Sequence, residues 1–140
     1  MRKVISLSFL LILATTLVMA IPDARQEPAQ AAGDRQAISY DKWLAAKENA
    51  ERHAREGRYV EALQHYLEYT RQAEGLGRPG LVAWGKNNAA YMIIKMHMQD
   101  PTVELAPAKK MLEEGLAIAE ATEACRERLA KNLEYIRSFL

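Results

Sequence analysis

The sequence predicts an all-α protein made of antiparallel helical hairpins. Three observations favour this class. From Tyr40 onward, apolar residues recur every three to four positions, which is the period of an amphipathic helix. No segment in this region alternates with the period of two that a β-strand requires. The interruptions between helical stretches are short and contain glycine and proline, as in Gly75–Gly80.

The N-terminus has the layout of a secretory signal. Two basic residues precede an uncharged apolar run from Val4 to Ala20, so residues 1–20 are predicted to be a cleaved signal peptide. Residues 21–38 lack periodicity and are predicted to be a flexible linker, which leaves 39–140 as the folded domain. The expected location is periplasmic or secreted. The alternative is a retained membrane anchor, for which about 17 apolar residues are a short span.

The balance of charge excludes two classes of partner. The chain carries 19 Lys and Arg residues against 18 Asp and Glu residues, and cleavage after Ala20 changes its formal net charge from +1 to −1. A nearly neutral surface provides no footprint for nucleic acid and no attraction to anionic lipid. Cys125 is the only cysteine, so an internal disulfide is excluded. Its place on an apolar stripe predicts a buried, inert thiol.

The first two helices are predicted over Asp41–Glu56 and Tyr59–Glu74. Gly57 ends the first helix, because glycine accepts the left-handed conformation that closes a helix. So short a link forces the two helices into an antiparallel pair. Small residues would bring their axes close, with Ala46 and Ala50 facing Ala62. The predicted buried stripe of the second helix is Tyr59, Ala62, Leu63, Tyr66, Leu67, Thr70 and Ala73.

Three further helices complete the domain. The third, about Leu81–Met98, is apolar on most of its circumference, with Tyr91 included, and is therefore predicted to be the buried centre. The fourth begins near Pro107, which suits a first helical turn. The last follows Thr122, a suitable N-cap. Phe139 and Leu140 at its end favour self-association, which is the expected behaviour of an uncovered apolar end.

A motif at the first link resembles the tetratricopeptide repeat (TPR) family. Gly57-x-Tyr59-x-x-Ala62-x-x-x-Tyr66 matches the turn and second helix of that repeat. The stretch Trp84–Tyr91 resembles the start of a second copy, Ala108-x-x-x-Leu112 its second helix, and Lys131–Tyr135 an incomplete third. The copies are about 40 and 44 residues apart, against 34 in the standard repeat. The resemblance implies repeat-packing roles for Ala50, Gly57, Tyr59, Ala62, Tyr66, Trp84, Ala108 and Leu112.

This resemblance implies a short TPR-like solenoid of about five helices that serves as a protein–protein interaction module. In such a stack, the first helices of successive pairs line a concave face, where a peptide or partner protein would bind. The implied groove residues are Lys47, Glu51, Arg55, Asn87, Asn88, Tyr91, Lys95, Lys131, Asn132 and Tyr135. Asparagine amides both donate to and accept from a peptide backbone, and the basic residues suit a carboxylate. For each charged residue alone, a solvated helix face is the alternative.

No pattern indicates catalysis or a cofactor. The three histidines stand far apart in the sequence and lack a zinc-ligand spacing, and no glycine-rich phosphate loop or nucleophile motif is present. The sequence therefore predicts a scaffold or adaptor and not an enzyme.

An unrelated helical bundle with a soft-metal or small-ligand site is the alternative. Its candidate Cu(I) ligands are Met92, Met96, His97 and Met98, although methionines on a helical stripe also serve as core packing.

Overall fold

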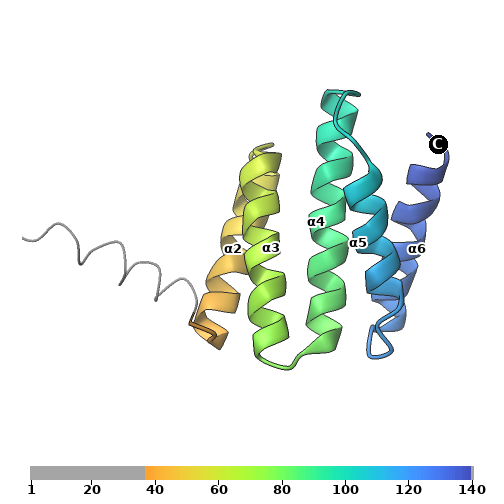
Figure 1. The fold of residues 1–140 in the computed structure, drawn as a ribbon. Helices are drawn as coiled ribbons and strands as arrows, with labels where there is room; N and C mark the ends of the chain where they lie inside the picture. Colours follow the sequence, from red (N-terminus) through yellow and green to blue (C-terminus); the bar gives the residue numbers. More distant parts are fainter. Residues whose placement is uncertain (1–36, 140) are drawn as a thin grey trace, which may run out of the picture. The chain divides into compact units, whose positions relative to one another are not determined.

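The protein folds as an array of helices, seen in a computed structural model that describes residues 37–139 (Figure 1). These residues form α2 (Tyr40–Arg55), α3 (Tyr59–Gly75), α4 (Pro79–Gln99), α5 (Ala106–Leu116) and α6 (Glu123–Arg137). Each helix packs chiefly against its neighbours in the chain, and α4 also contacts α6. The predicted all-α class is confirmed. The predicted signal peptide, most of the predicted linker and Leu140 lie outside the described residues.

The links α2–α3 and α3–α4 are built in the same way. Gly57 and Gly77 adopt φ values of 74° and 64°, a region that glycine enters without a steric penalty. The next residue, Arg58 or Arg78, donates its backbone N–H to a carbonyl five residues earlier, at 2.9 and 3.0 Å respectively. This bond is the signature of a Schellman turn. The repeated Gly-Arg pair therefore makes two successive antiparallel hairpins with the same closure.

Side-chain caps begin the first and last helices. Thr122 Oγ1 accepts a hydrogen bond from the Cys125 N–H at 3.2 Å, and α6 begins at the residue after the predicted cap. Ser39 Oγ accepts one from the Lys42 N–H at 3.2 Å and sets the start of α2 at Tyr40. Each cap satisfies an N–H that the helix itself leaves unpaired, which is worth about 1 kcal/mol.

Helix α4 is the centre of the domain, as its composition predicts. It supplies residues to all three hydrophobic clusters of the described chain. Ile93 lies in the largest cluster, with Leu129 of α6. Val82 lies in the cluster that surrounds Trp43, and Met92 packs with the small residues of the α2–α3 hairpin. One helix therefore joins the N-terminal hairpin to the C-terminal pair.

The predicted buried faces of α3 and α4 need two corrections. Helix α4 was predicted to be buried on most of its circumference, but its Tyr91 and Met98 side chains are 43% and 57% exposed. On α3, Leu67 is 44% exposed, whereas Tyr69 is 4% exposed and its ring centroid lies 5.1 Å from that of Trp43. The physical reason is that α3 packs between α2 and α4. Its buried arc therefore follows two neighbours and not the single apolar stripe.

The close approach of α3 and α4 depends on Gly85. A Cβ atom at this position would lie 2.2 Å from Thr70 Oγ1 and 2.8 Å from Tyr69 Cδ1. The Thr70 hydroxyl is itself held, because it donates to the Tyr66 carbonyl at 2.8 Å. A side chain at position 85 would therefore push α3 and α4 apart.

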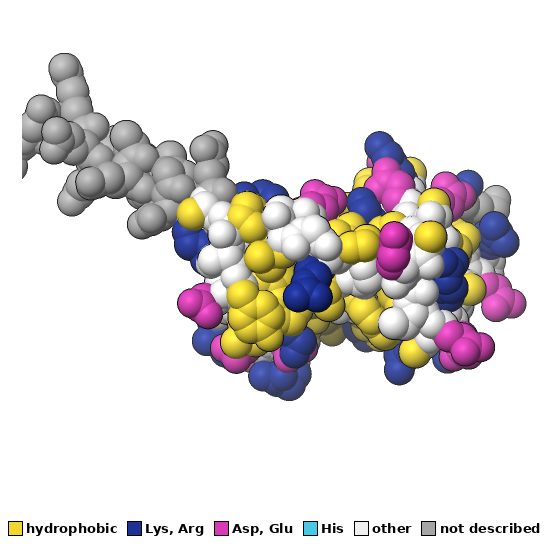
Figure 2. Space-filling view, turned by 90° about the horizontal axis from the view of Figure 1, so that it is seen from below, with side chains coloured by type: hydrophobic (Ala, Val, Ile, Leu, Met, Phe, Trp, Pro, Cys, Tyr) yellow, Lys and Arg dark blue, Asp and Glu magenta, His cyan; other side chains and the backbone are white. Residues whose placement is uncertain are grey.

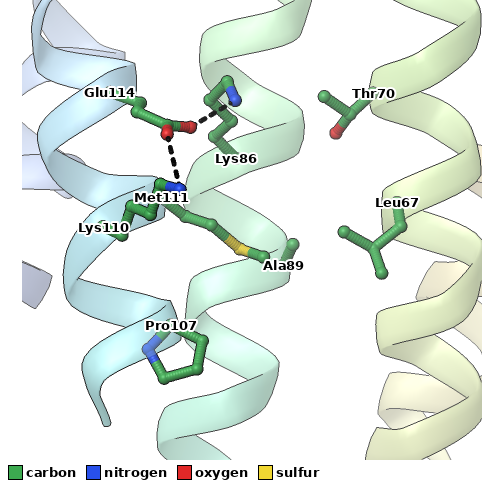
Figure 3. A pocket seen from close by; sticks show the side chains of 8 residues that line it. All are labelled: Leu67, Thr70, Lys86, Ala89, Pro107, Lys110, Met111 and Glu114. Carbon is green, nitrogen blue, oxygen red and sulfur yellow. Dashed lines mark hydrogen bonds and ion pairs between the residues drawn. The ribbon is translucent and has the colours of Figure 1, made fainter.

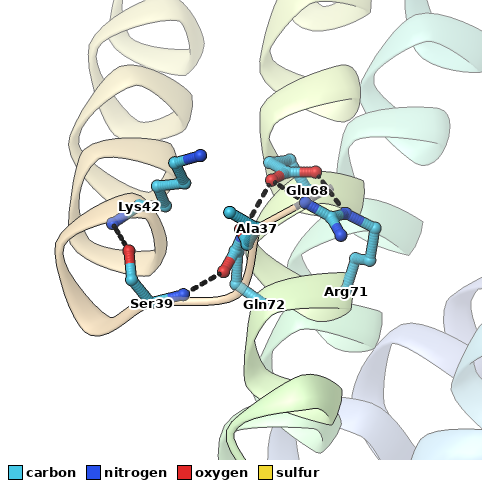
Figure 4. A network of polar contacts seen from close by, with 6 residues as sticks. All are labelled: Ala37, Ser39, Lys42, Glu68, Arg71 and Gln72. Atoms are coloured by element: carbon cyan, nitrogen blue, oxygen red, sulfur yellow. Dashed lines mark hydrogen bonds and ion pairs between the residues drawn. The ribbon is translucent and has the colours of Figure 1, made fainter. Parts of the chain in front are cut away.

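A buried glutamine attaches the segment before α2 to α3 (Figure 4). Gln72 is fully buried. Its Oε1 accepts from the Ser39 N–H at 2.9 Å, and its Nε2 donates to the Ala37 carbonyl at 3.0 Å and to Glu68 Oε1 at 2.8 Å. The sequence placed Ala37 and Ile38 at the end of the flexible linker. The structure instead makes them part of the folded unit, because the Gln72 amide satisfies the backbone on both sides of Ile38.

Hydrophobic side chains gather at the end of the domain where α2 begins and α3 ends (Figure 2). Ile38 and Tyr40 are 39% and 59% exposed there, and the Tyr40 ring centroid lies 5.1 Å from that of Trp43. Lys and Arg side chains, together with some Asp and Glu, lie around this group. Among residues 37–139, no helix combines the length and the apolar character that crossing a bilayer demands.

Candidate functional site

Two adjoining cavities run along the side of the domain formed by α2, α4 and α6. The first has a volume of about 330 Å³ and is lined by Trp43, Lys47, Glu51, Tyr69, Leu81, Trp84 and Asn88. The second has a volume of about 470 Å³ and is lined by Trp84, Asn87, Asn88, Tyr91, Arg128, Lys131 and Asn132. They share Trp84 and Asn88, so they adjoin one another. We call this feature the α2–α4–α6 groove.

Helical spacing explains why these side chains share one side. Trp84, Asn88 and Tyr91 are four and three residues apart, so they project from the same face of α4. Lys47 and Glu51 are four apart on α2 in the same way, and their side chains form an ion pair at 3.0 Å. Because the ammonium of Lys47 already faces a carboxylate, α2 brings little unbalanced charge to the groove.

A chain of amides crosses the groove from α4 to α6. Asn132 Nδ2 donates to Asn87 Oδ1 at 3.0 Å, and Asn87 Nδ2 donates to Asn88 Oδ1 at 3.1 Å. Asn87 is 5% exposed, so both ends of its amide are satisfied inside the protein. Asn88 Nδ2 and Asn132 Oδ1 make no hydrogen bond within residues 37–139. One donor and one acceptor therefore remain available at the two ends of the chain.

The α6 side of the groove is positively charged. Arg128 and Lys131 line the second cavity, and neither forms an ion pair with any residue of the described chain. No acidic side chain lines that cavity. Two cations beside the available amide groups of Asn88 and Asn132 suit a ligand that carries both a negative charge and peptide-like polar groups.

Seven of the ten residues implied for the groove line it, namely Lys47, Glu51, Asn87, Asn88, Tyr91, Lys131 and Asn132. The other three lie elsewhere. Arg55 is exposed near the end of α2. Lys95 Nζ lies 5.7 Å from the centre of the Tyr59 ring, and Tyr135 packs against the largest core cluster and against Phe139, at 4.9 Å between ring centroids. Each of the three lies four residues after a lining residue (Glu51, Tyr91 or Lys131), so it lies one helical turn beyond the two cavities.

Four lining residues were not among the site residues that the sequence suggested: Trp43, Tyr69, Leu81 and Arg128. Helical spacing contained the signal for two of them. Trp43 lies four residues before Lys47, and Arg128 lies three residues before Lys131, so each shares a face with a candidate. Tyr69 belongs to α3 and reaches the groove between α2 and α4. Burial raises its pKa to about 12, so its hydroxyl stays protonated.

The residues with implied repeat-packing roles lie mostly in the interior. Ala50, Ala62, Ala108 and Leu112 are fully buried, and Tyr66 is 7% exposed. Ala50 and Ala62 lie in the same cluster with Tyr66, and Tyr59 packs against it. Ala46 belongs to the neighbouring cluster around Trp43 instead. Trp84 is half-buried and forms the wall that the two groove cavities share.

A third cavity of about 240 Å³ lies on another side of α4, between α3 and α5 (Figure 3). Leu67, Pro107 and Met111 supply most of its apolar lining. Glu114 lies between Lys86, at 2.7 Å, and the more exposed Lys110, at 3.9 Å. The charges at this rim are therefore paired with one another, unlike Arg128 and Lys131 of the groove.

The candidate ligands for a soft metal have different surroundings. Met92 is buried in the cluster beside the α2–α3 hairpin, whereas Met96 packs against the cluster shared with α5 and α6. His97 Nδ1 lies 2.7 Å from the Val103 carbonyl, and Met98 is exposed. Within residues 37–139, no group of three or more His, Cys, Asp or Glu side chains is placed to hold a metal ion.

Cys125 is fully buried. Burial raises the pKa of its thiol, which keeps it protonated and unreactive.

Comparisons with known proteins returned no similarity: no family model matches the sequence, and no curated protein or solved structure is significantly similar to it.

Proposed function

We propose that this chain is an exported TPR-like module whose α2–α4–α6 groove binds an extended segment of a partner protein. Two features support a repeat-like stack. The α2–α3 and α3–α4 links repeat the same Gly-Arg closure, and each helix packs against the next in the chain, with α4 also reaching α6. In such a stack, alternate helices lie on one side, and α2, α4 and α6 are the alternate helices here.

The observation that carries the proposal is that the two cavities of the groove adjoin one another. Its two cavities have a combined volume of several hundred Å³ and meet at Trp84 and Asn88, which is the size range of sites that enclose ligands. One part is lined by aromatic rings and the other by amides and cations. A peptide segment matches this division, because it offers apolar side chains and a polar backbone in one molecule.

The chemistry of each part indicates what the segment contributes. An apolar side chain would pack against Trp43 and Trp84, where aromatic anchors dominate binding energy. A backbone amide group would bond to Asn88 Nδ2 and Asn132 Oδ1, the groups that lack a partner within the described residues. An acidic side chain next to it would neutralise Arg128 and Lys131. The expected ligand is therefore a peptide with an acidic residue beside a bulky apolar one.

A scaffold or adaptor role outside the cytoplasm follows from combining this groove with the predicted signal peptide. The partner is a protein, bound without catalysis or a cofactor. Its place in the cell would be the periplasm or the extracellular space, since a cleaved signal releases the domain there. Retention of the N-terminal segment would instead hold the domain at a membrane.

Selection of peptides from a displayed random library, followed by affinity measurements, tests this proposal. The full chain serves as bait, and Kd values of the selected peptides are compared for wild type, Asn88→Ala and the double variant Arg128→Ala/Lys131→Ala. Hydrogen bonds to charged groups contribute about 1.5–3 kcal/mol, so the double variant is expected to bind roughly tenfold or more weakly. Lys95→Ala is the matched control, because Lys95 lies on α4 outside the groove.

Two results would reject the groove as the binding site. One is an equal loss of affinity in the control and the groove variants, which would indicate a general effect of charge or stability. The other is full affinity in both groove variants, which would place the bound peptide on another surface.

A further inference from the structure

The only two histidines of the α2–α3 hairpin form a stacked pair, although they are twelve positions apart in the sequence. His53 of α2 and His65 of α3 have ring centroids 5.1 Å apart and planes inclined by 7°. Both are half-buried. His53 Nδ1 is buried and has no hydrogen-bond partner among the described residues. The pair lies next to the Gly57 turn and outside the groove, so nothing in the proposed binding role requires it.

The stack tolerates one charge better than two. A protonated imidazole carries an N–H on both nitrogens, so protonation of His53 would leave a buried donor unpaired, which is costly. A second positive charge at this distance would repel the first directly. Stacking of the two rings is therefore stable when at least one of them is neutral.

Charged neighbours on both helices also affect how readily the pair is protonated. Burial lowers the pKa of His65, and the nearby charges of His53 and Arg52 lower it further, while Glu68 opposes them. Glu56, directly after α2, and Glu68 of α3 stay ionised, because hydrogen bonds from Arg58 and Arg71 lower the pKa of these carboxyls. Between neutral and mildly acid pH, these carboxylates thus keep their charge, whereas an imidazole such as that of His65 can gain a proton.

We infer that the His53–His65 pair is an acid-sensitive latch that holds α2 against α3 at neutral pH and releases it when both rings are protonated. Helix α2 packs chiefly against α3, so a weaker contact between them loosens the whole of α2. The same helix supplies Trp43, Lys47 and Glu51 to the groove. Acidification would therefore weaken the groove as well, a consequence that rests on the proposed function, whereas the latch itself does not.

The direction of the pH effect follows from linkage. The folded state lowers the pKa of His65 below the ordinary value of 6.5, so the unfolded chain binds this proton first as the pH falls. The contribution of neutral His65 to the free energy of unfolding is therefore fully present above pH 6.5. This contribution declines as the pH falls from 6.5 to the pKa of His65 in the folded state, and at still lower pH no further loss occurs.

Urea unfolding of the full chain tests the latch, with tryptophan fluorescence as the signal. The urea midpoint of the wild type is expected to fall from about pH 7.5 to about pH 5.5, the interval in which an ordinary histidine gains its proton. His65→Gln is expected to lose most of this fall. His53→Phe keeps an aromatic ring in the stack without a charge, and is expected to lose part of this fall, because burial still lowers the pKa of His65. His97→Gln is the control, because His97 lies outside the pair and contacts the Val103 carbonyl.

A titration of His65 by NMR gives a second test. If the pair served only to pack the two helices, replacing His53 would not change the titration midpoint of His65. The midpoint of its ring resonance is expected below that of an ordinary histidine in the wild type and nearer to it in His53→Gln. An equal fall of the urea midpoint in wild type, His65→Gln and His53→Phe would overturn the latch, as would an unmoved His65 titration. Loss of peptide binding at both pH values would instead overturn the proposed function and leave these two measurements unaffected.

Discussion

Replacement of Gly85 by alanine tests how closely α3 and α4 pack. The added Cβ would lie 2.2 Å from Thr70 Oγ1, whereas ordinary contacts of a Cβ begin at 3.4 Å. Either Thr70 or the backbone of α4 must therefore move by about 1 Å, since packed interiors have no free space to absorb the overlap. Neither side chain can easily move away, because the Thr70 hydroxyl is hydrogen-bonded to the Tyr66 carbonyl and the Tyr69 ring packs on Trp43.

The expected cost combines two opposing effects. Overpacking of a core costs about 1–3 kcal/mol, and the clash at Gly85 is severe enough to place it in the upper part of this range. Alanine regains about 1 kcal/mol over glycine in a helix interior. The net loss in the free energy of unfolding is expected to be about 2 kcal/mol. In a domain of this size, that corresponds to a fall in Tm of roughly 8–16 °C.

Circular dichroism during thermal and urea unfolding measures this loss, with Gly115→Ala as the matched control. Gly115 is also a buried helical glycine, but its nearest neighbour is the terminal Cδ2 of Leu129, at 2.7 Å, which can rotate away. The control is expected to lose no more than about 1 kcal/mol. Thr70→Ala removes the closest atom, so Gly85→Ala should cost less in that background. A Gly85→Ala variant as stable as the wild type would refute the close packing of α3 on α4.

Three further predictions concern polar and titratable groups. Asn87→Ala removes the acceptor of the Asn132 amide. Because Asn132 is only half-buried, the free energy of unfolding is expected to fall by about 1 kcal/mol. This loss would be measured as a lower urea midpoint with an unchanged slope. An unchanged midpoint would show that the amide chain contributes nothing to stability. The raised pKa of Tyr69, about 12, makes the folded state hold this proton more tightly than the unfolded state. Stability is therefore expected to decline as the pH rises from about 10 toward 12, while a Tyr69→Phe variant loses less. The Cys125 thiol is expected to react with a disulfide reagent only after unfolding, since it is fully buried; rapid labelling of the native protein would contradict its burial.

Much of the secondary structure was accessible from local sequence. Helix periods, the left-handed glycine at position 57 and the Thr122 cap depend on residues within one or two turns of one another, so pattern alone indicates them. The observed starts of α2 and α6 agree with prediction within one residue. Helix α4 begins two residues earlier than predicted, because Pro79 and Gly80 are accommodated in its first turn, where proline is tolerated.

The contacts between helices were not accessible in the same way. Periodicity identifies one face of a helix but not its rotation and register against two neighbours. For this reason Leu67 was expected inside and Tyr69 was not. The hydrogen bond between Asn132 and Asn87 joins residues 45 positions apart, and the stacking of His53 on His65 depends on the alignment set by the Gly57 turn. Gln72 gave no signal, because its partners are backbone groups whose position depends on the path of the chain.

The binding site itself is tested most directly by nitrogen-15 NMR of the labelled full chain during titration with a selected peptide. Occupation of the groove is expected to shift the Trp84 indole N–H and the side-chain amides of Asn88 and Asn132, while the backbone amides of Leu67 and Met111 beside the α3–α5 cavity stay in place. Shifts at Leu67 and Met111 with an unmoved Trp84 indole would contradict the assignment of the α2–α4–α6 groove as the binding surface.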